Sequence, residues 1–189
     1  MNAANQGLAE ETLDAGEIGL DALFRAQYER IARVIGGVIR DHARAEELAV
    51  EVFLKWERTP KAHGEGAEGW LYRAAVRVAL NELRHRALVN RRHRVLATLA
   101  GREVDTPHDL LASRQERERV RSVLSAIDPR QAELLLLRSN DFSYQELASL
   151  LGLNPASVGT LLARALGKFR EEFIARYGKE RHGQGHEQE

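Results

Sequence analysis

The sequence predicts an all-α protein built from two small helical domains joined by a flexible linker, the second being a helix-turn-helix domain. Apolar residues recur at helical spacing through most of the chain, helix-forming residues dominate, and no stretch alternates like a β-strand. Residues 100–112 contain Gly and Pro and lack that periodicity, so they separate a first domain (residues 17–99) from a second (residues 113–177). The polar residues 178–189 are expected to be a disordered tail.

Composition narrows the class of protein. The 189 residues include no Cys, which excludes disulfides and thiolate metal sites and fits the cytoplasm. No apolar run is long enough to cross a bilayer, and the N-terminus lacks a signal-peptide pattern, so we expect no membrane insertion. Lys plus Arg and Asp plus Glu both number 28, which gives a net charge of zero.

The first domain should begin with two amphipathic helices and end with a long one. Apolar positions run through residues 21–39 and again through residues 46–56, with a short break over residues 41–45. Residues 59–69 contain one Pro and three Gly and predict an exposed loop. Residues 70–99 then predict one long helix or two nearly continuous ones, with an apolar face of Leu71, Ala74, Ala75, Val78, Ala79 and Leu83.

The charge is unevenly distributed along the chain. Residues 71–94 hold seven Arg and a single acid, Glu82, a net charge of about +6, whereas the rest of the chain is net negative. Such a concentrated positive segment favours phosphate binding, because each neutralised phosphate releases counterions. Trp70 and Tyr72 lie at its start, where an aromatic ring can either stack on an unpaired base or anchor the helix in its own core.

The second domain shows the start and stop signals of four helices. A charged helix is expected over residues 113–126, and Asp128 followed by Pro129 marks the start of the next, which contains the apolar run of residues 134–137. Two further helices meet at a short turn. Their signals are Ser143 with Glu146 as a capping box, Gly152 as a C-terminal residue with positive φ, Asn154 as an N-cap and Pro155 at the first helical position.

The last two helices have the plan of a helix-turn-helix, whose second helix can enter a DNA major groove. The expected buried stripe of that second helix is Val158, Leu161, Leu162, Ala165, Leu166 and Phe169. An ordinary helical hairpin in a bundle would show the same pattern, so this stretch alone does not decide for DNA binding.

No catalytic or metal-binding arrangement is evident. The seven His residues fall mostly in loops, basic surface or the tail, and no phosphate-binding loop, zinc-protease motif or nucleophile elbow occurs. The acidic pair Glu46-Glu47 lacks a nearby partner that would tune a general acid. We therefore expect a protein that is not an enzyme and that uses no cofactor and no metal.

Five stretches together carry a resemblance to a known family: residues 45–54, 69–84, 127–131, 134–138 and 142–153. In this order and spacing they resemble the bacterial RNA polymerase sigma factors of the sigma-70 family, and the short two-domain plan looks like the extracytoplasmic-function group. The resemblance covers roughly residues 20–175.

The resemblance implies a non-catalytic subunit that gives RNA polymerase its promoter specificity. Its partners would be core RNA polymerase (the β′ coiled coil and the β flap), promoter DNA and an anti-sigma factor. The polymerase-binding residues would be Glu47, Leu48, Glu51, Val52 and Phe53. The loop over residues 59–69 and the start of the next helix would capture an unpaired base of the minus-ten element, and the helix from Pro155 would read the minus-thirty-five element. The implied DNA-binding residues are Trp70, Arg73, Arg77, Asn81, Arg84, Arg86, Arg91 and Arg92 in the first domain, with Ser157, Thr160, Arg164 and Lys168 in the second.

The chain departs from the family pattern in both domains. Val50 stands where the family usually has Gln, and Arg44 stands where an acid is common. Family members usually carry Lys or Arg early in the recognition helix, whereas residues 155–163 carry no charge here, and Gly159 costs about 1 kcal/mol of helix stability relative to Ala. Two alternatives therefore stay open: a sigma-like regulator with weakened DNA binding that acts through protein partners such as an anti-sigma factor, and a stand-alone helix-turn-helix regulator.

Overall fold

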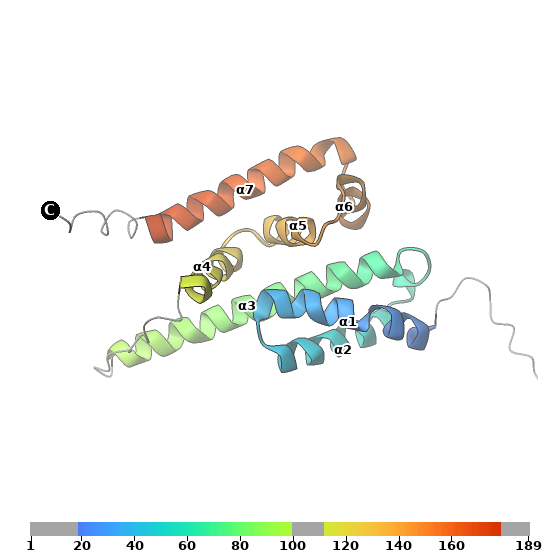
Figure 1. The fold of residues 1–189 in the computed structure, drawn as a ribbon, viewed down its shortest axis with the longest axis horizontal. Coiled ribbons are helices and arrows are strands. Elements are labelled where there is room, and N and C mark those ends of the chain that lie inside the picture. The colour runs from blue at the N-terminus through green and yellow to red at the C-terminus, as the bar shows by residue number, and fades with distance from the viewer. Residues whose placement is uncertain (1–18, 100–111, 179–189) are drawn as a thin grey trace, which may run out of the picture.

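A computed structural model describes residues 19–99 and 112–178, and all regular structure in these two ranges is helical. The all-α prediction is therefore confirmed. In chain order the helices are α1 (Leu20–Ile39), α2 (His42–Glu57), the 3-10 turn η1 (Pro60–Ala62), α3 (Ala67–Leu99), α4 (Ala112–Ala126), α5 (Pro129–Ser139), α6 (Tyr144–Leu151) and α7 (Pro155–Tyr177) (Figure 1).

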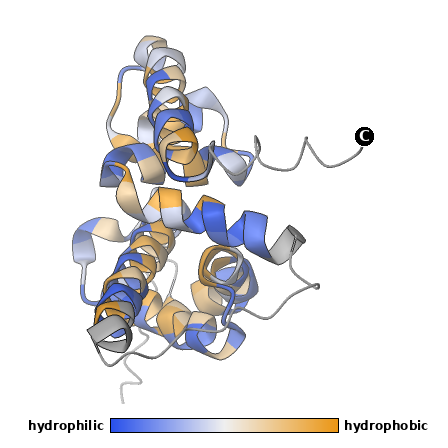
Figure 2. Ribbon diagram, turned by 90° about the vertical axis from the view of Figure 1, so that its left-hand side faces the viewer, coloured by the Kyte–Doolittle hydropathy of each residue, from blue (hydrophilic) through white to orange (hydrophobic). Residues whose placement is uncertain are grey.

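Helices α1, α2 and α3 pack against one another to form the first domain. Its most deeply buried large side chains come from all three helices and include Ile31, Ile35, Val52, Phe53, Leu71 and Leu80. The apolar periodicity of each helix therefore produces the core that the sequence predicts. In Figure 2 the ribbon alternates between apolar and hydrophilic residues along the helices, as expected of amphipathic helices.

The turn between α1 and α2 is tighter than the sequence suggests. Arg40 ends α1 in the left-handed region (φ 54°), and Asp41 then caps α2, its carboxylate accepting a hydrogen bond from the backbone N–H of Arg44 at 3.1 Å. Because this cap lets α2 begin at His42, the predicted break over residues 41–45 is wrong.

Helix α3 is a single helix of 33 residues, and it begins at Ala67 rather than at Trp70. The predicted loop over residues 59–69 is correspondingly shorter and contains the turn η1. Two side chains outside the predicted apolar face, Val76 and Leu80, are also buried, because the helix is covered on more than one side.

The second domain follows the predicted capping pattern closely. The Asp128 carboxylate accepts backbone N–H groups at the start of α5, Ser143 and Glu146 form the reciprocal capping box of α6, and the Asn154 side chain caps α7. Gly152 has the expected positive φ, 64°. One prediction is wrong: Leu166 is 55% exposed, because the buried stripe of α7 is centred on Val158, Leu162 and Ala165 and leaves Leu166 at its edge.

The two domains lie in contact. Helices α4, α5 and α6 follow one another along α3, and α7 packs against these three helices on the side away from α3 (Figure 1). The buried apolar residues of both domains belong to one continuous cluster. Helix α3 is therefore part of the first domain and at the same time the surface on which the second domain rests.

Some predictions fall outside the residues that the structure describes. These are residues 100–111 of the linker predicted over 100–112, residues 179–189 of the tail predicted over 178–189, and the N-terminal residues 1–18. Ala112 is the first residue of α4, and Gly178 follows the last residue of α7. Within the described ranges, no helix combines the length and the apolar character that a membrane span requires.

Candidate nucleic-acid interface

Most of the DNA-binding residues predicted for the first domain share one side of α3. Because an α-helix turns about 100° per residue, seven of the eight positions fall within about 100° of its circumference. We call this set the α3 stripe: Trp70, Arg73, Arg77, Asn81, Arg84, Arg91 and Arg92. The eighth residue, Arg86, lies on the opposite side of the helix.

Toward its N-terminal end the α3 stripe contacts the second domain. Arg77 donates a hydrogen bond from Nε to the Glu133 carboxylate at 2.8 Å, and Arg73 donates one from its guanidinium to the backbone carbonyl of Leu150. Glu133, on α5, is only 4% exposed and is the one buried charged residue in the described part of the chain. A buried carboxylate is unfavourable unless it is paired, and Arg77 supplies the pair.

Apolar contacts surround these two hydrogen bonds. The ring of Tyr72 meets the ring of Phe142 edge to face, with 4.9 Å between centroids. Gly69, in the first turn of α3, lies so close to Leu150 of α6 that a Cβ atom at residue 69 would overlap the leucine side chain. Trp70 is half-buried and packs against the core, so of the two roles that the sequence left open the structure shows the core contact.

The C-terminal part of the α3 stripe is more open. Asn81, Arg91 and Arg92 are exposed. Arg84 is half-buried, and one of its guanidinium nitrogens, Nη2, is buried without a hydrogen-bond partner among the described residues. An unpaired buried donor costs about 1–3 kcal/mol, so Arg84 gains more than an ordinary surface arginine from a phosphate or another acceptor.

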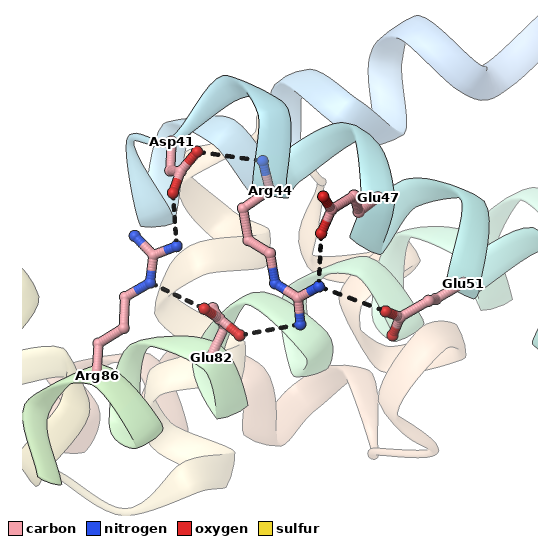
Figure 3. Close-up of polar contacts among 6 residues, drawn as sticks. All are labelled: Asp41, Arg44, Glu47, Glu51, Glu82 and Arg86. Carbon is pink, nitrogen blue, oxygen red and sulfur yellow. Dashed lines mark hydrogen bonds and ion pairs between the residues drawn. The ribbon is translucent and has the colours of Figure 1, made fainter. Parts of the chain in front are cut away.

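Arg86 belongs to a polar network that ties α3 to the start of α2 (Figure 3). It donates to Glu82 at 2.9 Å and to Asp41 at 2.8 Å, and Glu82 is also 3.4 Å from Arg44. On its other side Arg44 contacts Glu47 at 2.8 Å and Glu51 at 3.7 Å. Arg44, one of the two α2 residues that depart from the family pattern, thus links the two helices.

The network shifts the pKa values of its members. Burial alone would raise the pKa of Glu82, but the hydrogen bond from Arg86 and the charge of Arg44 bring it below its ordinary value. The pKa of Asp41 is also lowered, first by the backbone N–H of Arg44 and then by the side chain of Arg86. In turn, the carboxylates raise the pKa of Arg44 and of Arg86 despite their partial burial. These shifts mean that the fold holds all four groups in their charged forms.

The predicted polymerase-binding residues of α2 divide between core and surface. Leu48, Val52 and Phe53 are at most 3% exposed and form part of the first-domain core, so a docked partner cannot reach them in this arrangement. Glu47 and Glu51 are exposed. They share their side of the helix with Val50 and Leu54, which are about 40% exposed. The exposed side of α2 therefore includes Glu47, Val50, Glu51 and Leu54.

Trp56 and His63, which the sequence did not single out as functional residues, hold the loop before α3. The indole N–H of Trp56 donates to the carbonyl of Ala62 at 3.0 Å, and Nε2 of His63 lies 3.1 Å from the carbonyl of Trp56. The rings of Trp56 and His63 are 4.2 Å apart. A Trp that precedes a Pro- and Gly-containing loop was the available signal, although its hydrogen bond could not be read from spacing.

The predicted DNA-binding residues of the second domain form an exposed stripe on α7. Ser157, Thr160, Arg164 and Lys168 fall within about 80° of the helix circumference, and all four are exposed. Lys168 forms an ion pair with Glu171 at 2.6 Å, which raises the lysine pKa. The structure thus brings these residues together, with their positive charge confined to the later turns of α7.

In the described ranges, no group of three or more His, Asp or Glu side chains is placed to hold a metal ion. What the arrangement offers is a positive stripe beside aromatic rings in one domain and a capped, exposed helix in the other. Phosphate binding with base stacking and groove reading are the chemistries that these two surfaces support.

Comparison with known families accounts for both domains. The fold and its two exposed surfaces define the class of protein: a helical DNA-binding protein with a helix-turn-helix in its second domain. Sigma-70 region 2 matches residues 23–89, and Sigma-70 region 4 matches residues 117–169, together more than half of the chain. The chain belongs to the sigma-70 family of RNA polymerase sigma factors.

Individual relatives carry similar descriptions. The chain is 31% identical over 147 residues to the probable RNA polymerase sigma factor RfaY of Xanthomonas campestris, covering 74% of this chain but only 36% of that protein. It is 25% identical over 169 residues to the RNA polymerase sigma factor CarQ of Myxococcus xanthus, covering 86% of this chain and 93% of CarQ. A solved structure of the sigma factor RpoE in complex with the anti-sigma factor NepR from Bartonella quintana has 17% identity and a TM-score of 0.45, with 80% of this chain and 94% of RpoE covered.

Proposed function

We propose that the protein is an alternative sigma factor of the extracytoplasmic-function group, which directs RNA polymerase to specific promoters and assists promoter melting. The observation that carries the proposal is the α3 stripe, where five arginines share one side of a helix with Trp70 and Asn81. A melted strand needs positive charge for its phosphates and rings or amides for its bases, and this stripe has both.

The second domain is proposed to read duplex DNA at the minus-thirty-five element. Helix α7 is exposed along Ser157, Thr160, Arg164 and Lys168, and its start is capped by Asn154. A protruding helix can enter a major groove, and its first N–H groups favour a phosphate. The stretch of α7 without charge predicts that this contact is weaker than the contact made by α3.

The proposed protein partners are assigned from the exposed surfaces of the two domains. The coiled coil of the polymerase β′ subunit would dock on the outer face of α2, through Glu47, Val50, Glu51 and Leu54, and the β flap would contact the second domain. An anti-sigma factor is a third proposed partner. As a specificity subunit in the cytoplasm, the protein would contribute no catalytic group, cofactor or metal of its own.

One observation favours a second candidate function. Because residues 155–163 at the start of α7 carry no charge, the second domain could bind DNA too weakly to support initiation. The protein would then be a sigma-like regulator that binds an anti-sigma factor in place of an active sigma factor.

Reconstituted transcription separates the two candidates. Purified protein and core polymerase are incubated with a promoter library, and the transcripts are sequenced. We expect transcripts that start at a shared promoter motif and that depend on this protein. Binding to core polymerase without any dependent transcript would favour the second candidate, and no binding to core polymerase would refute the sigma-factor function.

A matched pair of variants tests the docking face within the same assay. Glu51→Lys reverses an exposed charge on α2 and should weaken polymerase binding. Glu29→Lys makes the same charge change at an exposed position on α1, a different helix from the proposed face, and should bind core polymerase as the wild type does.

A further inference from the structure

Helix α2 carries two exposed apolar side chains on its outer side. Val50 is 39% exposed and Leu54 is 42% exposed, and they are the only large apolar side chains of α1 and α2 that are exposed. Because residues four apart in an α-helix lie on the same side of it, the two side chains form one patch. We call Val50 and Leu54 the α2 apolar pair.

Glu47 and Glu51, which lie next to the α2 apolar pair, share one cation. Nη1 of Arg44 is 2.8 Å from a carboxylate oxygen of Glu47 and 3.7 Å from one of Glu51 (Figure 3). The negative charge of both carboxylates is therefore partly neutralised within the chain itself, before any partner binds.

Arg44 is also held from the side of α3. Its Nη2 lies 3.4 Å from Glu82, whose side chain is only 15% exposed, and Glu82 accepts a further hydrogen bond from Arg86 at 2.9 Å. Because a guanidinium is planar with fixed N–H directions, a contact at Nη2 also fixes the direction of Nη1. Isolated surface ion pairs contribute little, but networks of several charges are the exception. Arg44 therefore remains directed at Glu47 and Glu51.

We propose that the chain docks on polymerase mainly through the α2 apolar pair, and that Arg44 lowers the contribution of Glu47 and Glu51 to that contact. The proposal rests on the docking of α2 on the β′ coiled coil proposed above, and it adds which groups supply the affinity. The partner surface that fits is a helix with apolar side chains opposite the pair. Basic residues on that helix contribute little here, because the acids that they would meet are already paired.

The two departures of α2 from the family pattern act in the same direction. Arg44 stands where an acid is common, which lowers the negative charge of the docking side, and Val50 stands where Gln is usual, which makes that side more apolar. An acid at this position in other members also indicates that the partner carries basic residues nearby. This chain thus has the apolar contact strengthened and the charged contact weakened.

The rates of binding to core polymerase separate the two contributions, because charges mainly change the association rate and buried contacts mainly change the dissociation rate. Val50→Ala combined with Leu54→Ala should dissociate at least about tenfold faster than the wild type, with little change in association. Since both side chains are exposed in the free protein, urea denaturation should show an unchanged free energy of unfolding, which excludes misfolding as the cause.

Arg44→Gln releases Glu47 and Glu51 and tests the neutralisation. Its association should be about threefold faster than that of the wild type at about 50 mM salt, and the difference should vanish at about 0.5 M salt, where exposed charges are screened. Arg44→Lys keeps the cation and should associate as the wild type does. Arg25→Gln is the matched control, because Arg25 pairs with Asp21 at 3.0 Å on another helix, α1, and its removal should leave both rates unchanged.

Glu51→Gln tests one carboxylate directly. Because Arg44 already pairs with Glu51, loss of its charge should change the affinity for core polymerase by less than about twofold. Glu51→Lys still weakens docking, since it places an unpaired cation beside the α2 apolar pair.

Three results would overturn the proposal: unchanged dissociation of the apolar double variant, association of Arg44→Gln at low salt that is no faster than that of the wild type, and a severalfold loss of affinity in Glu51→Gln. A role of Arg44 in stability alone could not produce faster, salt-dependent association. If the wild type fails to bind core polymerase at all, the proposed function itself is refuted, and that result is distinct because every other comparison is made against measurable wild-type binding.

Discussion

The two domains divide the requirements of DNA recognition between them. The first domain supplies positive charge: α3 carries a stripe of arginines, and two of them, Arg73 and Arg77, form hydrogen bonds with the second domain. The second domain supplies a helix that can enter a groove: α7 is capped and exposed, yet its first nine residues carry no charge. We infer that affinity for DNA comes mainly from the first domain, and that the second domain contributes position more than strength.

A similar contrast exists within α3 itself. In the α3 stripe, Arg91 and Arg92 are exposed, and Arg73 and Arg77 form hydrogen bonds with the second domain. Arg86, on the opposite side of α3, is instead held by Glu82 and Asp41 within the first domain (Figure 3). The number of arginines in a segment therefore overstates its capacity for phosphates, because some are committed to the fold.

The largest expected effect comes from removing open arginines of the first domain. Arg84→Ala combined with Arg91→Ala should weaken binding of the polymerase-bound protein to fork DNA by about tenfold or more. It should also reduce the salt dependence by about 1.4 logarithmic units per decade of salt, at about 0.7 per lost phosphate contact. Binding is measured by fluorescence anisotropy over a range of salt concentrations.

Arg86→Ala is the internal control for this experiment. Because its guanidinium is paired with Asp41 and Glu82, we expect a change in stability and an unchanged salt dependence. If Arg86→Ala lowers the salt slope as much as each removed stripe arginine does, the distinction between the two sides of α3 is wrong.

A smaller effect should follow from giving α7 the charge it lacks. Thr160 is exposed and lies on the α7 stripe with Ser157 and Arg164, so a longer side chain there extends on the proposed DNA side. Thr160→Lys should strengthen binding to minus-thirty-five duplex about fivefold through a new phosphate contact. Thr160→Ala changes the side chain without adding charge and should bring no gain in affinity. Equal gains for Lys and Ala would contradict the electrostatic reason.

The next largest effect should come from removing a helix cap in the second domain, which lowers its stability. Ser143→Ala removes the acceptor of the α6 capping box and should lower the free energy of unfolding by about 1 kcal/mol in urea denaturation. Ser149→Ala, at an exposed position inside the same helix, is the control and should cost nothing. A loss of stability shared by both variants would mean that the cap is not the cause.

The smallest predicted effect concerns acid stability of the first domain. The folded-state pKa of Glu82 lies below its ordinary value of 4.5, so its ion pairs stabilise the fold fully above about pH 4.5 and progressively less as pH falls through the folded-state pKa. Stability measured by urea denaturation at about pH 7 and about pH 3 should therefore fall further in the wild type than in Glu82→Gln. Equal losses would show that the network does not contribute.

Features set by nearby residues could be predicted from the sequence. The capping box of Ser143 and Glu146, the positive φ of Gly152 and the start of α7 all depend on groups within a few positions. The same logic failed at α2, because Asp41 was read as part of a break when its carboxylate caps the helix.

Features set by distant residues could not be predicted. Family resemblance indicates that α2 contacts polymerase but does not show which side, and Leu48, Val52 and Phe53 are in the core. Likewise, nothing in the spacing of residues pairs Arg77 with Glu133, since they are brought together only by packing of α5 on α3. The sequence could thus place the candidate residues on their helices, but it could not separate the side chains that are free from those that are held by other groups.

The order of α3 and its cover along the chain has a consequence during synthesis. The three helices of the first domain are complete by residue 99, whereas the helices that pack on α3 from the second domain begin at α4. At ~5–20 residues per second, the ribosome needs roughly 4 to 16 s to make the residues from the end of α3 to the end of α7. For the part of that interval after α3 has left the ribosome, a growing chain would hold a folded first domain with a bare stripe of arginines, close to the messenger and ribosomal RNA.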